Sequence, residues 1–470
     1  MPVSRRSLLK GAVGASGALV LGGALRPNSS LATSDTFSTA QTLGALPDPA
    51  KSGIEHVVVV MMENRSFDHF LGWLPGANGR QGGLAYPDPT GRRVPTWHAN
   101  VTNGCGFTDP DHSYQGGRIQ YDHGAMDGFL KDTANDIYAV SYYEAADRPF
   151  MSTLALNFTS CDHYFCSILG PTYPNRFFQH AAATDRLSNT STTSTLPTIW
   201  DQLNQPGGPT GRYYFSDVPF LALWGQKYLS ISGHYADFLA SAQAGTLPNV
   251  SYIDPRFEDE GDGTSNDDHP LADIRAGDSL LSEIFHAVSS GPSWANTVMI
   301  VNYDEWGGFF DHVAPPRITP GVPIGASPSS GVDQDLVNGK VLAGFRVPSI
   351  LASPFTRGRP ERPKVAHGLF DHTSVLKLIE WRWGLKPLSA RDASRSPSDP
   401  GNLATIMDFA HPDPTVPALP NLLPFVPESC TVHNPAVGGG PAPAATSTSA
   451  SQESDAWAAL RSSELMNGWL

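Results

Sequence analysis

The chain has 470 residues, and its 31 Lys and Arg against 45 Asp and Glu give a formal net charge of −14. An acidic surface repels phosphate backbones, which argues against nucleic acid as a partner. This length allows up to three domains, but a single α/β enzyme with long insertions also reaches it.

The first 32 residues are typical of a twin-arginine export signal. Arg5 and Arg6 precede a Gly- and Ala-rich stretch over 11–25 that is too short to span a bilayer, and a small-residue cleavage site fits at 30–32. Without residues 1–32 the chain keeps 27 basic and 45 acidic residues, a formal charge of −18. We therefore predict a secreted, periplasmic or cell-surface protein that uses the twin-arginine translocase and has no stable transmembrane anchor. The alternative is a basic disordered tail.

Two apolar runs rich in β-branched residues each end in a pair of oxygen-bearing side chains. Residues 55–62 lead into Glu63 and Asn64, and residues 297–303 lead into Asp304 and Glu305. Such runs predict buried strands, and ligands in open α/β sheets lie beyond the carboxyl ends of the strands. The four side chains are therefore expected in one crevice, where oxygen ligands suit Ca²⁺, Mg²⁺ or Mn²⁺. Alternatively, each pair is only a solvated strand end.

The segment GPTYPNR presents a hydroxyl, Thr172, just ahead of a predicted helix at 176–183. A helix N-terminus favours an anion, and a hydroxyl there is well placed to attack phosphorus once a metal ion activates it. Alternatively, Thr172 only caps the helix or completes a turn.

The remaining pattern alternates strands with helices. Strands are expected at 249–253 and 347–352 besides the two above, and helices at 279–288 and 372–383. This alternation predicts a three-layer α/β fold with a central, mostly parallel mixed sheet and helices on both faces. A Gly- and Pro-rich stretch at 315–339 is expected to be a surface loop near the site.

Four segments, ENRSFDH, GPTYPNR, YDEWGGFFDHVAPP and FDHTSVLKLIEWRWG, appear in this order. Over residues 54–385 the chain resembles the bacterial phosphoesterase family of exported phospholipases C and a related acid phosphatase, of the alkaline phosphatase-like superfamily. The resemblance implies a divalent metal ion held by Glu63, Asn64, Thr172, Asp304 and Glu305. It also implies that Thr172 forms a covalent phospho-enzyme.

Further groups are needed to protonate the leaving group and to bind phosphate. His269 and His112, each preceded by an acidic residue, are the catalytic candidates, although either can be a buried structural residue. Asn175, Arg176 and His372 are candidates for substrate phosphate binding. Alternatively, Arg176 pairs with an acidic neighbour, and His372 caps the following helix. His69 and His312 are expected to support the site rather than bind the metal.

The predicted function is an exported, metal-dependent phospholipase C that releases diacylglycerol and a phosphorylated head group from glycerophospholipids. An acid phosphatase acting on phosphomonoesters would use the same residues. In a different class, the chain would be an exported binding protein that has lost catalysis, but the complete acidic set argues against this.

Four cysteines in an oxidising compartment predict one or two disulfides, with three possible pairings. Residues 33–433 are expected to form the catalytic domain and 434–470 a low-complexity tail. Within that tail, a short amphipathic helix is expected at 455–470, with Trp457, Leu460 and Leu465 on its apolar side.

Overall fold

The computed structural model describes residues 46–326, 332–333, 335–430 and 450–469. All of them belong to one compact unit, Phe37–Leu470. The predicted export signal lies outside the described residues, as do parts of the 315–339 loop and of the low-complexity tail.

In the described chain, eight strands form the central sheet, in the order β14-β6-β13-β10-β1-β9-β7-β8. Only β13 runs antiparallel to its neighbours, β10 and β6. The predicted α/β fold with a mostly parallel mixed sheet is confirmed. The strands are β1 His56–Met62, β6 Thr159–Cys161, β7 Gly211–Phe215, β8 Ser232–His234, β9 Val250–Ile253, β10 Thr297–Tyr303, β13 Ser349–Ala352 and β14 Lys364–Ala366.

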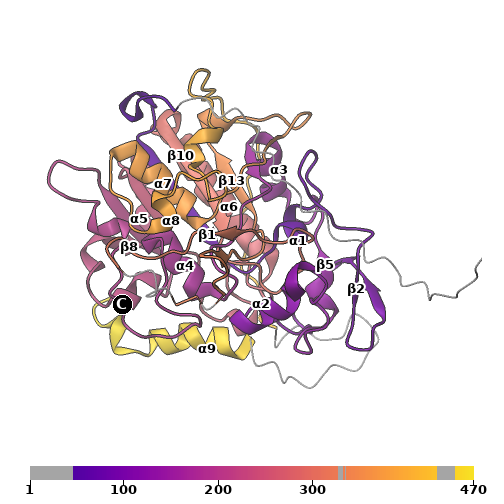
Figure 1. Cartoon of the computed structure of the whole chain (residues 1–470). Helices are drawn as coiled ribbons and strands as arrows, with labels where there is room; N and C mark the ends of the chain where they lie inside the picture. Colours follow the sequence, from indigo (N-terminus) through magenta and orange to yellow (C-terminus); the bar gives the residue numbers. More distant parts are fainter. Residues whose placement is uncertain (1–45, 327–331, 334, 431–449, 470) are drawn as a thin grey trace, which may run out of the picture. The chain divides into compact units, whose positions relative to one another are not determined.

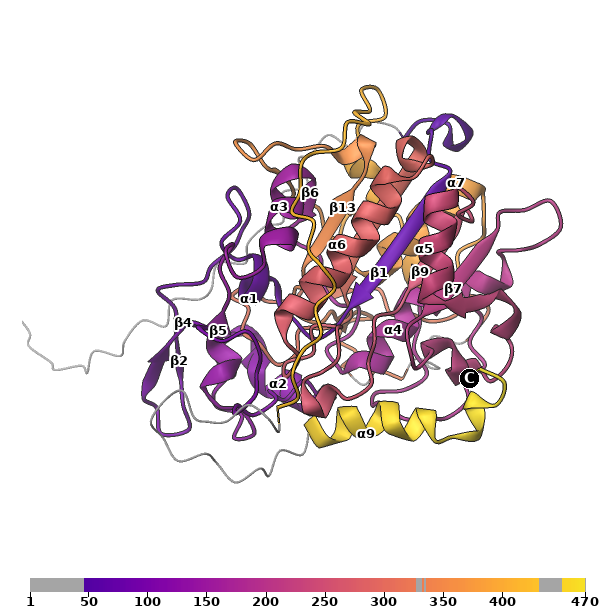
Figure 2. The same cartoon turned by 180° about the vertical axis from the view of Figure 1, so that it is seen from behind.

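Helices cover both faces of this sheet (Figures 1 and 2). On one face α6 packs against α3 and α5, and on the other α7 packs against α4 and α8. Their bounds are α3 Pro149–Asn157, α4 Thr172–Ala181, α5 Tyr235–Ala244, α6 Ile274–Ser290, α7 His372–Trp383 and α8 Ala390–Ala393. The two short helices α1 Phe67–Leu71 and α2 Tyr114–Tyr121 lie in the insertions between strands.

Among the described residues, three small two-stranded sheets lie outside the central sheet. They pair β2 Ala85–Pro87 with β3 Arg93–Pro95, β4 Trp97–His98 with β5 Ser141–Tyr142, and β11 Arg317–Ile318 with β12 Val341–Leu342. The loop after β11 is fastened to α2, since Tyr114 donates a hydrogen bond to Asp333 at 2.8 Å. Its described part therefore lies against α2.

Local sequence signals account for the helix that was predicted most accurately, α7. Asp371 accepts the backbone N–H of Thr373 and completes a capping box with Ser374, and Gly384 ends the helix at φ 66°. The other two predicted helices have different ends. The helix expected at 176–183 begins four residues earlier, and the one expected at 279–288 extends to Ile274–Ser290.

The predicted C-terminal helix is α9, Ala450–Arg461, which begins before the expected residue 455 and ends before the expected residue 470. Leu465 therefore lies outside it, in the short 3-10 helix Glu464–Met466. In α9, Trp457 and Leu460 are buried. The indole of Trp457 stacks on Phe257, and the backbone carbonyl of Ala456 accepts a hydrogen bond from Tyr173 at 3.1 Å. This part of the tail therefore belongs to the folded unit. Among the described residues, no helix is both long enough and apolar enough to cross a membrane.

Candidate active site and metal centre

The two motif strands are direct neighbours in the sheet. β1 and β10 pair in parallel with Met62 opposite Tyr303. Glu63 and Asp304 therefore leave adjacent strands at the same level, and the Asp304 N–H donates to the Met62 carbonyl at 3.1 Å. The side chains of Glu63, Asn64, Thr172, Asp304 and Glu305 are all fully buried.

Asn64 joins the two strand ends. It adopts φ 58°, and its backbone N–H donates to Asp304 Oδ1 at 3.1 Å. Gly307, at φ +63°, passes so close that an added Cβ would lie 1.9 Å from the Asn64 carbonyl oxygen. Only glycine fits there, so the close packing of the two motif loops depends on it.

Thr172 is the first residue of α4, and Pro171 is the N-cap. Its hydroxyl donates to Asn64 Oδ1 at 3.3 Å. Thr172 therefore does not cap the helix, but points its hydroxyl at the predicted metal-binding group. Asn175 fastens the preceding loop, since its amide donates to Gly170 O at 2.8 Å and its Oδ1 accepts the Ile168 N–H at 3.1 Å.

Arg176 lies beneath these carboxylates. Its Nε donates to Asp304 Oδ2 at 3.0 Å, and Nη1 donates to Asp254 Oδ1 at 3.2 Å. Nη2 lies 3.8 Å from Glu63 Oε2. Burial by itself would lower the pKa of Arg176, but Asp304 and Glu63 outweigh it and raise this pKa. Arg176 thus pairs with acidic neighbours, which was the alternative to phosphate binding, and its role toward substrate remains a prediction.

A second group of acids meets Glu63. Single oxygen atoms of Glu63, Glu260 and Asp267 lie within 4.8 Å of one another, and all three side chains are buried. Burial raises the pKa of Asp267 to about 6. Buried acids gathered at this density require protons or a cation. The oxygen-rich donor set fits a hard divalent ion, which Glu63, Asn64, Thr172, Asp304 and Glu305 would hold with Asp267 and Glu260 beside them.

Glu260 and Asp267 were not predicted as site residues. Asp267 belongs to the DDHP segment and entered the prediction only as a neighbour of His269. Glu260 lies in the run EDEGD, which looks like an exposed acidic loop. The pairing of the Glu63 N–H with the Asp267 carbonyl, at 2.8 Å, brings this segment to the end of β1.

The two candidate catalytic histidines lie close together, with ring centroids 6.4 Å apart. His112 Nδ1 donates to the Pro110 carbonyl at 2.7 Å, so Nε2 is the acceptor and faces the Asn64 amide at 3.5 Å. Neither ring nitrogen of His269 has a hydrogen-bond partner within the described chain; Asp109 Oδ2 lies 3.6 Å from its Nε2. Burial lowers the pKa of His269 well below its usual value, and His112 and Arg65 add to this effect. His269 is therefore neutral at rest.

His372 also reaches the site, but it contacts the backbone. Its Nε2 donates to the Asp304 carbonyl at 2.7 Å, and Nδ1 lies 3.3 Å from the Tyr164 hydroxyl. The helix cap is Asp371, and His372 is the first helical residue. His372 thus positions Asp304, and its proposed contact with phosphate is untested.

The model of the Phosphoesterase family matches residues 54–218 and 200–386. The chain belongs to this family. Phospholipase C B of Mycobacterium tuberculosis is 31% identical, over 82% of this chain and 84% of its own length. Non-specific phospholipase C1 of Arabidopsis thaliana is 32% identical, over 74% and 70%. Non-hemolytic phospholipase C of Pseudomonas aeruginosa is 30% identical, over 87% and 64%.

Some solved structures also resemble this chain, at lower sequence identity than the phospholipases C. A protein in the alkaline phosphatase superfamily from Vibrio parahaemolyticus has a TM-score of 0.32 at 12% identity, covering 74% of this chain and 73% of its own. The PsFucS1 sulfatase from Pseudoalteromonas sp. has a TM-score of 0.38 at 10% identity, covering 78% of each chain. The family match makes the chain a phosphoric ester hydrolase.

The loops of this phosphoesterase are held by a second buried network. Arg346 donates to Asp311 Oδ1 at 2.9 Å and to Asp68 Oδ1 at 3.0 Å. His312 contacts Asp68, and His69 donates from Nδ1 to the Ser141 carbonyl at 2.6 Å. His69 and His312 therefore support the two motif loops, and the expectation that neither binds the metal stays a prediction.

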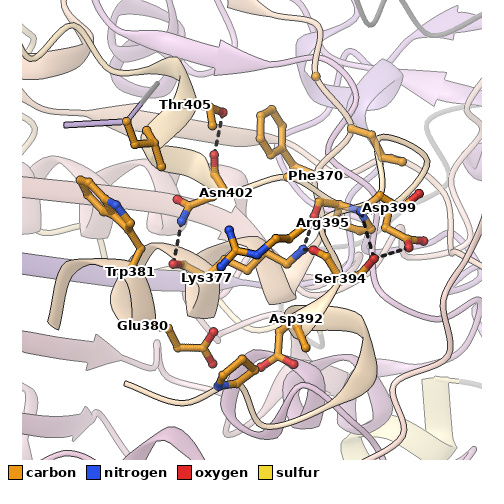
Figure 3. Close-up of a pocket in the computed structure, with 18 of the residues that line it drawn as sticks. Phe370, Lys377, Glu380, Trp381, Asp392, Ser394, Arg395, Asp399, Asn402 and Thr405 are labelled. Atoms are coloured by element: carbon orange, nitrogen blue, oxygen red, sulfur yellow. Dashed lines mark hydrogen bonds between the residues drawn. The ribbon is translucent and has the colours of Figure 1, made fainter. Parts of the chain in front are cut away.

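A cavity of about 630 Å³, with some of its lining residues drawn in Figure 3, has none of the predicted active-site residues in its wall. It is lined by the second half of α7 and by 392–406, where Lys377 donates to the Ser394 carbonyl at 2.7 Å. Glu380 in its wall has a pKa raised to about 10 by burial and by Asp392. A smaller cavity of about 430 Å³ lies beside Glu260, between the 257–262 loop and α9.

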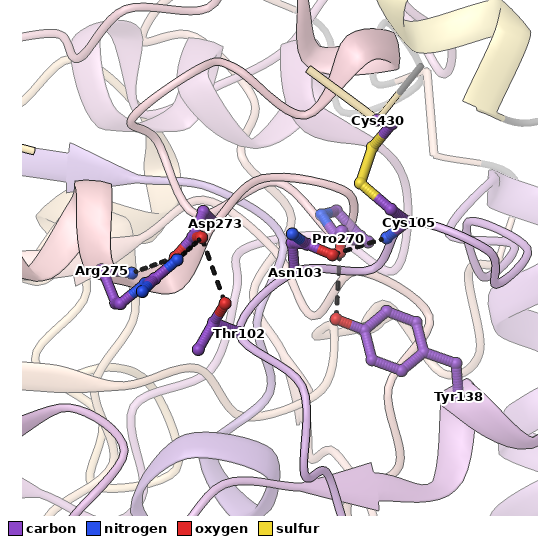
Figure 4. The surroundings of a disulfide bond; sticks show 8 residues. All are labelled: Thr102, Asn103, Cys105, Tyr138, Pro270, Asp273, Arg275 and Cys430. Carbon is purple, nitrogen blue, oxygen red and sulfur yellow. Dashed lines mark hydrogen bonds and ion pairs between the residues drawn. A yellow bond between two sulfur atoms is a disulfide. The ribbon is translucent and has the colours of Figure 1, made fainter. Parts of the chain in front are cut away.

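One disulfide supports the acidic loop of the phosphoesterase (Figure 4). Cys105 is joined to Cys430, whose N–H donates to the Asp262 carbonyl at 2.7 Å. Next to it, the Tyr138 hydroxyl donates to the Pro270 carbonyl at 3.0 Å, one residue after His269. Cys161 and Cys166 are free and buried. Of the one or two disulfides predicted, the described chain therefore contains one.

Proposed function

We propose that this phosphoesterase is a divalent-metal-dependent phospholipase C that hydrolyses glycerophospholipids through a phospho-threonine intermediate. The observation that carries the proposal is the position of Thr172. Its hydroxyl lies at the N-terminus of α4 and donates to Asn64, whose own N–H donates to Asp304 at the end of the neighbouring strand β10. The similarity to phospholipases C of three organisms supports the substrate class.

In the first step, Thr172 Oγ1 forms a bond to phosphorus as the bond from phosphorus to the diacylglycerol oxygen breaks. The helix N-terminus stabilises the negative charge on the phosphoryl oxygens. A bound divalent cation would lower the pKa of the threonine hydroxyl and polarise the phosphoryl group. In the second step, water attacks phosphorus, releases the phosphorylated head group and restores Thr172.

The proton of Thr172 needs an acceptor, and the departing diacylglycerol oxygen needs a proton. His112 has its Nε2 lone pair toward Asn64, the residue that contacts Thr172. His269 is neutral at rest, so it must take up a proton before it can donate one. We therefore assign this pair the transfer of the threonine proton to the leaving oxygen.

Hydrolysis of p-nitrophenyl phosphorylcholine beside p-nitrophenyl phosphate, with and without a chelator, tests the proposal. We expect faster release from the choline diester, loss of release with the chelator, and loss in Thr172→Ala. Thr153→Ala is the matched control, because its hydroxyl donates only to its own helix, at 2.7 Å to the Pro149 carbonyl. Release from the monoester alone would make the enzyme a phosphatase, and full activity in Thr172→Ala would exclude Thr172 as the nucleophile.

We also propose export by the twin-arginine route. Arg5 and Arg6 carry this proposal, and the disulfide supports it because such bonds persist in oxidising compartments. Replacing both arginines with lysine should retain the protein in the cytoplasm, as fractionation would detect. Unchanged export of this double variant would contradict the proposed route.

A further inference from the structure

A second group of side chains that could hold a metal ion lies at the edge of the sheet, and it includes none of the predicted active-site residues. β6 and β14 pair in parallel with Cys161 opposite Ala366. Asp162 and His367 therefore follow the carboxyl ends of adjacent strands at the same level, and His163 follows Asp162. The backbone register, rather than chance proximity of surface loops, brings the three residues together.

The donor atoms are spaced for a small cation. Asp162 Oδ2 lies 2.8 Å from His367 Nδ1, and Asp162 Oδ1 lies 3.2 Å from His163 Nδ1. The ligand atoms of all three residues lie within 4.8 Å of one another. Ligands about 2.0 Å from a tetrahedral zinc ion are themselves about 3.3 Å apart. The side chain of His367 is 50% exposed, so it has room to turn toward a bound ion.

The carboxylate at the centre is held in place by its surroundings. Asp162 is fully buried, and its Oδ2 accepts the Asn78 N–H at 2.7 Å. Its backbone carbonyl accepts a hydrogen bond from Arg346 at 2.9 Å. A fixed carboxylate with supporting hydrogen bonds is the arrangement that metal sites require of their ligands.

The site is open to solvent on one side. His367 lines the cavity of about 630 Å³ beside α7, so an ion can enter without local unfolding. Two imidazoles and one carboxylate leave a fourth position for water and suit Zn²⁺ or Co²⁺. The oxygen-rich active site suits hard cations instead, so the two sites differ in the metal they select.

We propose that Asp162, His163 and His367 form a second metal site that binds Zn²⁺ independently of the active site. A bound ion joins the ends of β6 and β14 and holds the segment 367–371, which leads directly into His372. The competing explanation is that Asp162 only forms a hydrogen bond with His367 and an ion pair with His163. The two explanations differ in whether binding of a transition metal depends on both imidazoles.

The test is titration of the full-length protein with Co²⁺, followed by visible absorption, in excess Ca²⁺ to occupy the oxygen-rich site. We expect one equivalent to produce the intense bands of a four-coordinate ion, and Zn²⁺ to displace it. His163→Ala and His367→Ala should each weaken this binding at least tenfold, since even outer-shell partners contribute about that much. In thermal unfolding, Zn²⁺ should raise the Tm of the natural chain but not that of His367→Ala.

His411→Ala is the matched control, because His411 is an exposed histidine paired with a single carboxylate, Asp408, at 3.3 Å. It should bind Co²⁺ like the natural chain. Circular dichroism establishes that each variant is folded. Equal Co²⁺ affinity and stoichiometry in His163→Ala, His367→Ala and the natural chain would overturn the proposal, as would a Zn²⁺-induced Tm shift that persists in His367→Ala.

Discussion

The indole of Trp457 lies flat on the ring of Phe257, with centroids 4.0 Å apart and planes at 4°. Phe257 in turn lies under the guanidinium of Arg176, at 4.5 Å. The C-terminal helix is thus connected through one aromatic ring to the arginine that pairs with Asp304. A segment that reads as the end of a low-complexity tail is therefore part of the packing around the active site.

Replacing Trp457 measures how much α9 contributes to the free energy of unfolding. Trp457→Ala should lower the free energy of unfolding by about 3–5 kcal/mol, the usual cost of removing a buried tryptophan. Urea denaturation checks this value, and Trp457→Phe should lose clearly less because it keeps an aromatic ring on Phe257. A loss below about 1 kcal/mol in Trp457→Ala would mean that α9 adds little to the fold.

Arg176 should matter for stability as well as for activity. Arg176→Ala leaves Asp304 and Asp254 without their buried cation, so we expect a loss of about 3–5 kcal/mol in unfolding free energy. Arg176→Lys keeps the charge but cannot reach both carboxylates with a planar fork, and should lose less stability while still losing activity. Arg212→Ala, an exposed position, serves as the control. Wild-type stability in Arg176→Ala would contradict the assigned role.

The two acids missed by sequence reasoning give a test of the metal centre. Glu260→Gln and Asp267→Asn should each weaken Mn²⁺ binding by about 10–100-fold, whether they bind the ion or orient its ligands. Isothermal titration measures this directly. Asp259→Asn, one residue before Glu260 but exposed, should leave the affinity unchanged. Equal affinity in all three variants would remove Glu260 and Asp267 from the site.

The free energy of unfolding should depend on pH because of His180. Burial, with Arg176 adding to it, lowers the pKa of His180 to about 3, while an unfolded histidine titrates near 6.5. Between these values the unfolded chain binds more protons, so the free energy of unfolding falls as pH falls, by about 1.4 kcal/mol per unit. From pH 7 to pH 5 the natural chain should therefore lose about 2 kcal/mol more than His180→Gln.

Glutamine is the appropriate replacement because its carbonyl can still accept the hydrogen bond that Trp200 Nε1 donates to His180, at 3.2 Å. Denaturation curves of both proteins at pH 7 and pH 5 provide the comparison. Parallel losses in the two proteins would show that His180 is not the group responsible.

The disulfide should stabilise the site region. Cys105 and Cys430 are 325 residues apart in the chain, so reduction should lower the free energy of unfolding by about 2–5 kcal/mol. The Tm and the activity should fall on adding dithiothreitol, and Cys105→Ser should behave like the reduced protein and ignore the reductant. Cys161 and Cys166 should stay unmodified by iodoacetamide in the native protein, because burial raises the pKa of both thiols.

The sequence predicted the parts of the fold that have strong local signals. The four consecutive valines of β1 and the run of β10 identify central strands, and their register explains why Glu63 and Asp304 meet. The short strands β6, β7, β8 and β14 were missed, because three to five residues of mixed polarity give no clear period. Their pairing is decided by tertiary contacts.

In the candidate site too, some features could be predicted from the sequence and others could not. Residues at strand ends could be predicted, since the sheet fixes their direction. The partners of Asn175, Arg176 and His372 could not, because they depend on which carbonyls and carboxylates the folded chain brings near. Glu260 was not predicted for the same reason, since the sequence of an acidic loop does not reveal that the Glu260 side chain is buried.

The disulfide between Cys105 and Cys430 also determines whether the fragments of a cleaved chain separate. Thr172, Glu260, Asp267, His269 and the Asp304–Glu305 pair all lie between the two cysteines, while Glu63 and Asn64 lie outside. Leu423 and Val426, 84% and 83% exposed, offer a cutting site within the enclosed stretch. A single cleavage there leaves the two fragments joined by the disulfide. The cleaved enzyme would therefore migrate as one band in denaturing electrophoresis without a reductant, and as two bands with it.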